Sequence, residues 1–243
     1  MTTVMITGAN RGIGMALTRC YLGEGADVIG CCRDPATAQA LSALAAHSTA
    51  RLRVMALDVA DEASIANLRR ELGDQPIDIL IHNAGINGTP KEQSDKRIDA
   101  DSYLLTMRVN ALAPLLLSQA LLGNLMRGSQ KKLVAISSDL ASTGTDYGAT
   151  SLVRSERYSY RASKAALNNG MRGLARDWAV HGISILMLNP GFVKTDMTGA
   201  RALASASAIS AEHSARNLAA RIAELTLEAS GSFRDHAGNT LAW

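Results

Sequence analysis

The feature that most constrains the fold is a regular alternation of short apolar runs with longer amphipathic segments. The apolar runs cover residues 2–7, 26–32, 52–57, 77–81, 132–137 and 183–188. Helical spacing of apolar residues covers 12–23, 35–46, 61–72, 101–127, 157–180 and 211–228, before a tail at 231–243. Strands that are mostly apolar throughout are typical of a parallel sheet buried on both faces. We therefore expect an α/β fold, a doubly wound parallel sheet with helices on both faces, in a single domain over residues 1–243.

Composition disfavours several classes of function. The 243 residues are 47% hydrophobic and 19% charged, as in ordinary globular proteins. The net charge of +3 is spread along the chain and only 4% of residues are aromatic, which gives nucleic-acid binding no support. Cys20, Cys31 and Cys32 lack the spacing of a metal site or disulfide framework, so no metal is expected. The longest apolar run, 112–122, is too short for a bilayer, and the start lacks signal-peptide features. We expect a cytoplasmic protein without a membrane partner.

A glycine-rich loop joins the first predicted strand to the first predicted helix. Its spacing is G-x-x-x-G-x-G, and glycines in this position let the backbone approach a pyrophosphate at a helix N-terminus. Loops of this kind also serve methyltransferases or form simple tight turns. The strand–turn–helix context favours a dinucleotide. The candidate residues of this loop are Gly8, Asn10, Arg11, Gly12, Ile13 and Gly14.

The end of the second predicted strand bears on the type of cofactor. An acidic residue at this point usually holds a free ribose 2′-hydroxyl, whereas an arginine accommodates a 2′-phosphate. Here Arg33 follows the strand, and Arg11 lies on the same side, so two guanidinium groups can bind a phosphate. This favours NADP(H). Asp34 keeps NAD(H) open, because a change of one residue in the strand end would bring its carboxylate to the ribose.

Tyr160 and Lys164 are the candidate catalytic pair, at the start of the helical segment 157–180. Four residues apart, they lie on the same helix face. A free phenol titrates near pH ~10 and is a poor acid at neutral pH. A nearby cation is expected to lower the pKa of the phenol towards the range useful for general acid catalysis. Tyrosine and lysine also meet at this spacing by chance.

With these residues in hand, the chain resembles the short-chain dehydrogenase/reductase family from end to end. The similarity implies a Rossmann fold. The stretch 159–168 and the ending 238–243 are similar to the branch of C-factor-type and sniffer-type carbonyl reductases. The motifs that carry the resemblance, in the order of the family, are Thr7–Gly14, Asp58–Val59, Asn83–Ala84–Gly85, Asn110, Ser138, Tyr160 with Lys164, and Pro190–Gly191 followed by Thr195.

The resemblance implies reduction of a carbonyl to an alcohol, or the reverse. Tyr160 would be the general acid or base, and Ser138 would hydrogen-bond the reacting oxygen. Lys164 would lower the pKa of the phenol and bind the nicotinamide ribose. Asn110 would anchor a water that relays protons to Lys164, beside a helix kink caused by Pro114. Ser137 competes with Ser138, but neighbouring strand residues face opposite sides, so Ser137 is expected in the core.

Further cofactor contacts follow from the same resemblance. Asp58 would bond the adenine amino group and Val59 would contact the ring. A second stretch, Asn83, Ala84 and Gly85, would pass the adenosine ribose. A third group would hold the carboxamide or pyrophosphate, namely Pro190, Gly191, Val193 and Thr195. The polar segments 139–157 and 194–210 follow predicted strands and are candidate walls of the substrate site.

Two expectations concern partners and the alternative class of function. Helices 101–127 and 157–180 carry apolar residues on more than one face, which predicts further burial of these faces. Related enzymes pair these helices, so a homodimer or homotetramer is expected, unless segment 194–210 covers the same surface. The alternative function is a non-catalytic NAD(P)-binding signalling protein on the same scaffold. The four catalytic candidates favour the enzyme, and a methyltransferase has no use for the Tyr160–Lys164 pair.

Overall fold

A seven-stranded sheet forms the centre of the protein in the computed structural model, which describes residues 1–89, 93–144 and 157–243. Its strand order is β3-β2-β1-β4-β7-β8-β9, and every neighbouring pair is parallel. The strands are β1 (Thr3–Thr7), β2 (Asp27–Cys32), β3 (Leu52–Ala56), β4 (Ile79–His82), β7 (Lys132–Ile136), β8 (Ser184–Asn189) and β9 (Ser232–Asp235). Strands β5 (Gln93–Ser94) and β6 (Arg97–Ile98) form a separate small antiparallel pair. The expected doubly wound parallel sheet is confirmed.

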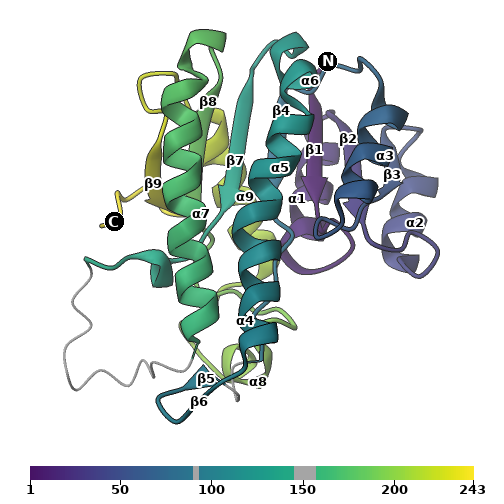
Figure 1. Ribbon diagram of the computed structural model, residues 1–243. Coiled ribbons are helices and arrows are strands. Elements are labelled where there is room, and N and C mark those ends of the chain that lie inside the picture. The colour runs from purple at the N-terminus through teal and green to yellow at the C-terminus, as the bar shows by residue number, and fades with distance from the viewer. Residues whose placement is uncertain (90–92, 145–156) are drawn as a thin grey trace.

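Helices cover both faces of the sheet (Figure 1). One face carries α3, α4, α5, α6 and α7, and the other carries α1, α2 and α9. The bounds are α1 (Gly12–Gly23), α2 (Gln39–His47), α3 (Glu62–Leu72), α4 (Ala100–Met107), α5 (Ala113–Ala120), α6 (Leu122–Arg127), α7 (Tyr158–Asp177), α8 (Gly199–Leu203) and α9 (Ala211–Ala223). Among the described residues, no helix combines the length and apolar character needed to cross a membrane.

Each central strand contributes to two separate hydrophobic cores. In β1, Val4 and Ile6 pack on the side of α1 and α9, while Met5 packs on the side of α3, α5 and α7. In β4, Ile81 faces the first side and Leu80 the second. Successive strand residues point to opposite faces, so a strand buried on both faces must be apolar at nearly every position. This burial explains the unbroken apolar runs of the sequence.

The segment expected as one helix over 101–127 is interrupted, which corrects the prediction. A π-helical turn, η2 (Arg108–Leu112), separates α4 from α5, and α6 begins after a second break at Leu121. Proline at position 114 has no amide hydrogen for the carbonyl of residue 110. The π-helical turn contains Asn110 and ends at Leu112, two residues before this proline. Such turns are frequent at functional sites.

The C-terminal region holds the second main difference from the sequence prediction. Residues 232–235 of the expected tail form β9, an edge strand with one buried large apolar residue, Phe233. Its single hydrophobic side chain gives little strand signal. Three helices are also shorter than expected: α2 begins at 39, α7 ends at 177 and α9 ends at 223. Segment 194–210 contains the unpredicted helix α8.

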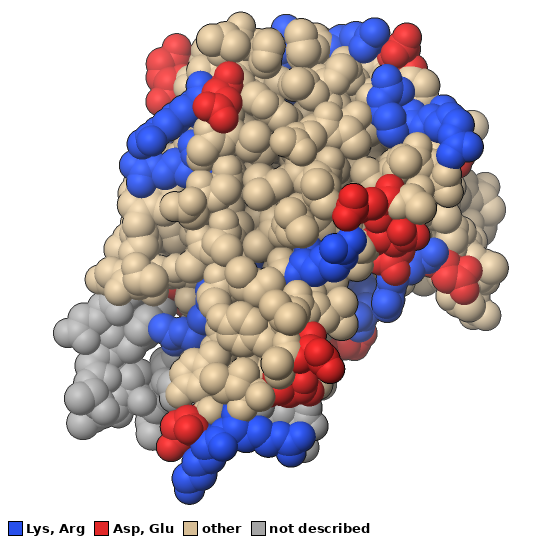
Figure 2. Space-filling view, viewed as in Figure 1, with Lys and Arg blue, Asp and Glu red and all other residues tan. Residues whose placement is uncertain are grey.

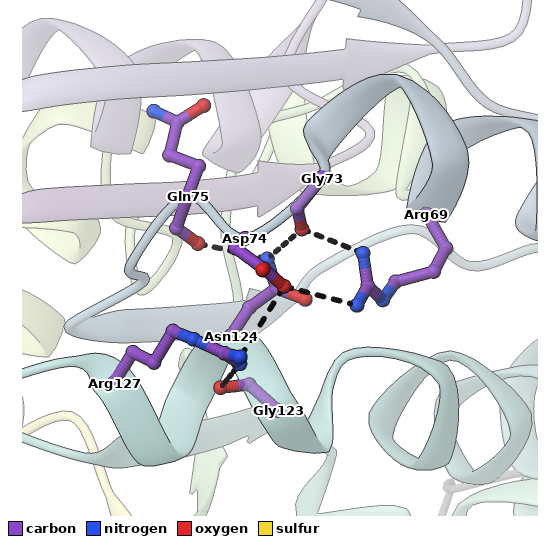
Figure 3. A network of polar contacts seen from close by, with 7 residues as sticks. All are labelled: Arg69, Gly73, Asp74, Gln75, Gly123, Asn124 and Arg127. Carbon is purple, nitrogen blue, oxygen red and sulfur yellow. Dashed lines mark hydrogen bonds and ion pairs between the residues drawn. The ribbon is translucent and has the colours of Figure 1, made fainter.

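A polar network fixes the loop between α3 and β4 at the edge of the sheet opposite the strands' carboxyl ends (Figure 3). Asn124 of α6 is fully buried and donates to the carbonyls of Gly73 and Gln75 at 2.9 and 2.8 Å. Asp74 forms ion pairs with Arg69 at 3.6 Å and with Arg127 at 3.3 Å. The network joins two helices structurally and lies away from the edge where ligands bind parallel sheets.

Asp78 is a buried carboxylate at the start of β4. It accepts hydrogen bonds from the Thr3 amide at 2.8 Å, from the Ser129 amide and hydroxyl at 2.6 and 2.7 Å, and from the Gln130 amide at 3.3 Å. Burial alone would raise its pKa, but these donors outweigh burial and hold the pKa of Asp78 below its usual value.

This arrangement predicts an acid-sensitive contribution to stability. A depressed native pKa stabilises the fold above the unfolded value of about 4, and this stabilisation is lost as pH falls through the native pKa. We expect Asp78→Asn to lower the free energy of unfolding by about 1–3 kcal/mol at pH 7, with a smaller difference below pH 4. Urea titrations at both pH values measure this, with the exposed Asp177→Asn as control. Equal losses at both pH values would contradict the role of the charge.

Candidate functional site

The glycine loop between β1 and α1 adopts a conformation that requires its glycines. Gly8 and Gly12 have φ values of +66° and +54°, in the left-handed region that favours glycine. Gly14 is needed for space, because a Cβ there would lie 2.1 Å from the Gly8 carbonyl oxygen. The glycine pattern predicted that Gly14 contacts the cofactor, but Gly14 packs within the loop and does not line the cleft.

The loop after β4 is joined to the glycine loop by side-chain hydrogen bonds. Asn83 Nδ2 donates to the carbonyls of Thr7 and Gly8 at 2.9 and 3.1 Å. The Thr7 hydroxyl oxygen accepts from the amides of Asn83 and Ala84, both at 3.0 Å. The expected cofactor residue Asn83 thus holds two loops together at the carboxyl ends of adjacent strands.

At the end of β2, Arg33 and Asp34 both line the cleft, but the acid is engaged in a local turn. Arg33 is exposed and lines the cleft. The Asp34 carboxylate accepts from the Ala36 amide at 3.0 Å and from the Thr37 hydroxyl at 3.0 Å. Both carboxylate oxygens are therefore engaged in the local turn. Arg11 lines the same cleft, where its guanidinium pairs with Asp196 at 3.1 Å instead of lying free beside Arg33.

Lys164 lies deep in the site, on the first turns of α7. Its side chain is 5% exposed, and Nζ donates to the Ile136 carbonyl at the end of β7 at 2.7 Å. Burial lowers the pKa of Lys164 to about 8. Nζ lies 5.8 Å from the centre of the Tyr160 ring. The spacing of four residues therefore brings the amine and the phenol ring together on one helix face, as expected.

The electrostatics of Tyr160 differ from the expectation. Burial raises the pKa of the phenol above its usual value; a hydrogen bond with Ser138 and the charge of Arg157 lower it, and the charge of Asp139 raises it. Burial has the largest effect, so the net direction is upward rather than downward. The Lys164 amine contacts the ring face and the Ile136 carbonyl. The prediction that Lys164 lowers the pKa of Tyr160 is therefore not met by these residues alone.

The two serines after β7 have different partners. Ser137 is 2% exposed and donates to Asn168 Oδ1 at 2.7 Å, so its hydroxyl is satisfied, but it is Ser137 and not Ser138 that lines the cleft. Ser138 begins the short turn η3 (Asp139–Ala141) and is the serine that interacts with Tyr160. Segment 139–157, expected as a substrate wall, lies mostly outside the described residues, since 145–156 are not described.

Asn110 is fully buried within the π-helical turn η2. Its Oδ1 accepts from the Ile86 amide at 2.8 Å, and its Nδ2 donates to the Ile86 carbonyl at 2.8 Å and to Ser163 Oγ at 3.0 Å. Both amide hydrogens are engaged, so a bound water would have to use another group of this residue. The main-chain carbonyl is a candidate, because Pro114 cannot donate an α-helical hydrogen bond to it. The predicted water site remains a prediction.

These elements surround a cleft of about 630 Å³ along the carboxyl ends of the strands. The expected cofactor residues that line it are Gly8, Asn10, Arg11, Gly12, Ile13, Arg33, Asp58, Val59, Asn83, Ala84, Gly85, Tyr160, Lys164, Pro190 and Thr195. Five expected residues do not line it: Gly14, Gly191, Val193, Asn110 and Ser138. Val193 is buried and pairs with Ile209 instead.

Sequence reasoning missed several other residues of the cleft. Leu105 and Val109 lie one helical turn apart, and this apolar spacing in the sequence could have indicated that both line the cleft. Asp196 reaches Arg11 from a distant segment, so no local pattern predicts the pair. The further lining residues are Cys32, Thr37, Leu57, Ala60, Ile86, Ile136 and Met197. Asp34 and Ser137, the sequence-based competitors of Arg33 and Ser138, line the cleft as well.

The residues present fit a dinucleotide. The glycine loop offers its backbone at a helix N-terminus, where amide hydrogens and the helix dipole favour a pyrophosphate. A Cβ on Gly85 would lie 3.2 Å from Asn110 Oδ1 and 3.8 Å from Lys164 Nζ, so glycine keeps the floor of the cleft open beside the amine. Arg33 and Tyr160 both line this one cleft.

Comparison with known proteins agrees with this geometry. A family model described as short chain dehydrogenase matches residues 2–205. C-signal of Myxococcus xanthus is 35% identical over 170 residues, which cover 69% of this chain and 93% of that protein. The structure of NADPH-bound carbonyl reductase from chicken fatty liver has a TM-score of 0.90 at 33% identity, covering 100% of this chain and 99% of the other. Carbonyl reductase Sniffer of D. melanogaster has a TM-score of 0.85 at 27% identity, covering all of both chains.

Proposed function

The chain belongs to the short-chain dehydrogenase family, and we propose that it is an NADP(H)-dependent oxidoreductase that reduces an aldehyde or ketone to an alcohol, or catalyses the reverse reaction. The observation that carries the proposal is the meeting of Tyr160, Lys164 and the glycine loop in one cleft. The solved carbonyl reductase that binds NADPH supports it, because that structure superposes over the whole chain.

Each side chain has a defined task in this proposal. Bound NADP(H) supplies or accepts the hydride. Tyr160 gives its phenolic proton to the carbonyl oxygen of the substrate, or takes it back in the oxidation. Ser138 donates a hydrogen bond to the same oxygen and stabilises its developing negative charge. Lys164, with a pKa of about 8, is largely protonated at neutral pH and can hold ribose hydroxyls.

The cofactor end is assigned to the remaining residues of the cleft. Arg33 and Arg11 recognise the 2′-phosphate, and Arg11 exchanges its pairing with Asp196 for this contact. Asp58 contacts the adenine. One of its oxygens already accepts from the Ala60 amide at 2.9 Å, which fixes the direction of the carboxylate. The main-chain amides of the glycine loop bind the pyrophosphate.

Loss of absorbance at the reduced-nicotinamide band tests this function. Purified protein is given NADPH or NADH with a panel of aldehydes, ketones and quinones. We expect turnover that is faster with NADPH. Tight cofactor binding without turnover on any carbonyl would favour the second candidate, a non-catalytic NAD(P)-binding signalling protein. The similarity to C-signal is the observation that favours this second candidate.

We also propose that the protein forms a homodimer or homotetramer through the face of α5 and α7. Charged side chains lie mainly around the edges of this face (Figure 2). Leu112 and Met126 of the adjoining segments are 42% and 44% exposed. Sedimentation is expected to give at least twice the chain mass of 25.6 kDa. A single species at the monomer mass would contradict the assembly and leave the enzymatic proposal intact.

A further inference from the structure

The turn after β7 controls the direction of the Ser138 hydroxyl. Ser138 Oγ accepts from the Leu140 amide at 3.2 Å and donates to Asp139 Oδ1 at 3.1 Å. The same Leu140 amide also contacts Asp139 Oδ1 at 2.9 Å. The carboxylate and the hydroxyl are thus held side by side by one main-chain amide, in a turn that Ser138 itself caps.

A serine hydroxyl has one proton, and Ser138 can donate it in a hydrogen bond either to Asp139 Oδ1 or to the phenolic oxygen of Tyr160. A hydrogen bond to a carboxylate is stronger than one to a neutral oxygen. The proposed reaction requires the same proton for the carbonyl oxygen of the substrate. Ser138 can supply it only by rotating its O–H bond away from Asp139, a rotation that needs no movement of heavy atoms.

Asp139 also acts on the phenol through its charge. Three charged groups among the described residues surround Tyr160: Asp139 after β7, Arg157 directly before α7, and Lys164 on its first turns. Arg157 lowers the pKa of the phenol, and Asp139 raises it. Lys164 lies over the ring. Asp139 is therefore the negative member of this group and opposes the formation of a phenolate.

We propose that Asp139 is a positioning residue that holds the Ser138 hydroxyl in the resting site and sets the pH range in which Tyr160 exchanges its proton. The proposal rests on the oxidoreductase function given above. Asp139 makes its contact through Ser138, and its side chain is exposed at the surface. Asp139 would thus restrain both proton donors of the site, Ser138 and Tyr160.

Asp139→Asn is the direct test, because the amide keeps an acceptor oxygen and removes the charge. The phenol of Tyr160 is titrated by ultraviolet difference absorbance, with the spectrum of Tyr160→Phe subtracted in each background. We expect the titration midpoint to fall by about half a pH unit, since the removed charge is partly screened by water. The control Asp177→Asn, at the far end of α7, is expected to leave the midpoint unchanged. An unchanged or higher midpoint in Asp139→Asn would overturn the proposal.

Activity gives an independent readout of the hydrogen bond. We expect Asp139→Asn to raise kcat for reduction by about twofold to fivefold, because Ser138 is released from a charged acceptor. In a Ser138→Ala background this gain should vanish, while the shift of the phenol titration should persist. A gain of equal size without Ser138 would overturn the positioning role. If no carbonyl is turned over, the oxidoreductase function fails, but the phenol titration still decides the effect of Asp139 on Tyr160.

Discussion

Replacing Tyr160 with phenylalanine is expected to lower kcat/KM by roughly 10²- to 10⁴-fold, the range that a positioned general acid contributes. The change removes one oxygen and keeps the ring that packs beneath Lys164. The amine keeps its hydrogen bond to the Ile136 carbonyl, so the floor of the cleft should retain its shape. Steady-state rates with NADPH and an active carbonyl measure the loss.

The cofactor affinity separates loss of chemistry from loss of structure. Fluorescence titration with NADPH should give Tyr160→Phe a Kd within about twofold of the original protein, because the phenolic oxygen is only one of many cofactor contacts. Tyr158→Phe is the matched control, since it removes the same atom two residues earlier in α7. It should keep near-normal rates. A Tyr160→Phe variant that retains most of its activity would mean that another group donates the proton.

The sequence allowed the sheet and most of the cleft to be predicted, for a physical reason. Strands buried on both faces must be apolar throughout, and a main chain that meets a pyrophosphate needs glycine, so both leave strong local patterns. β9 left no such pattern, because Phe233 is its single large buried residue. The strand is otherwise held by pairing with β8. The ion pair of Arg11 with Asp196 depends on two segments that only the folded chain brings together.

The catalytic groups show that a local sequence pattern predicts the position of a side chain but not its pKa. Spacing placed Tyr160 and Lys164 on one helix face, which the structure confirms. It did not give the electrostatic outcome, because burial by the surrounding elements has the largest effect on both groups. The pKa of a buried group depends on all the elements packed around it. Asp139 illustrates the same point, since its influence depends on the turn that directs it towards Ser138.

The choice between Arg33 and Asp34 leads to the second prediction with a large expected effect. The sequence left both residues open as cofactor contacts. In the structure, both residues are exposed and line the cleft, but both oxygens of Asp34 accept hydrogen bonds from the turn at 36–37. A carboxylate held in this way would have to give up its local donors to reach a ribose hydroxyl.

We therefore expect Arg33→Ala to weaken NADPH binding by about tenfold to hundredfold, the effect of losing a charge-assisted contact to phosphate. NADH has no 2′-phosphate, so its Kd should change by less than about threefold. Titration of both cofactors with both proteins measures the difference, and Arg176→Ala on the far part of α7 controls for the loss of one positive charge.

Asp34→Ala completes this comparison by testing the competing residue. If Asp34 only stabilises its own turn, its removal should affect NADPH and NADH equally. A selective loss of NADH in Asp34→Ala, together with equal losses of the two cofactors in Arg33→Ala, would assign the ribose to the acid and reverse the cofactor preference. The opposite pattern would mean that the guanidinium group of Arg33 discriminates between NADPH and NADH. Arg11 would then supply the remaining positive charge once it leaves Asp196.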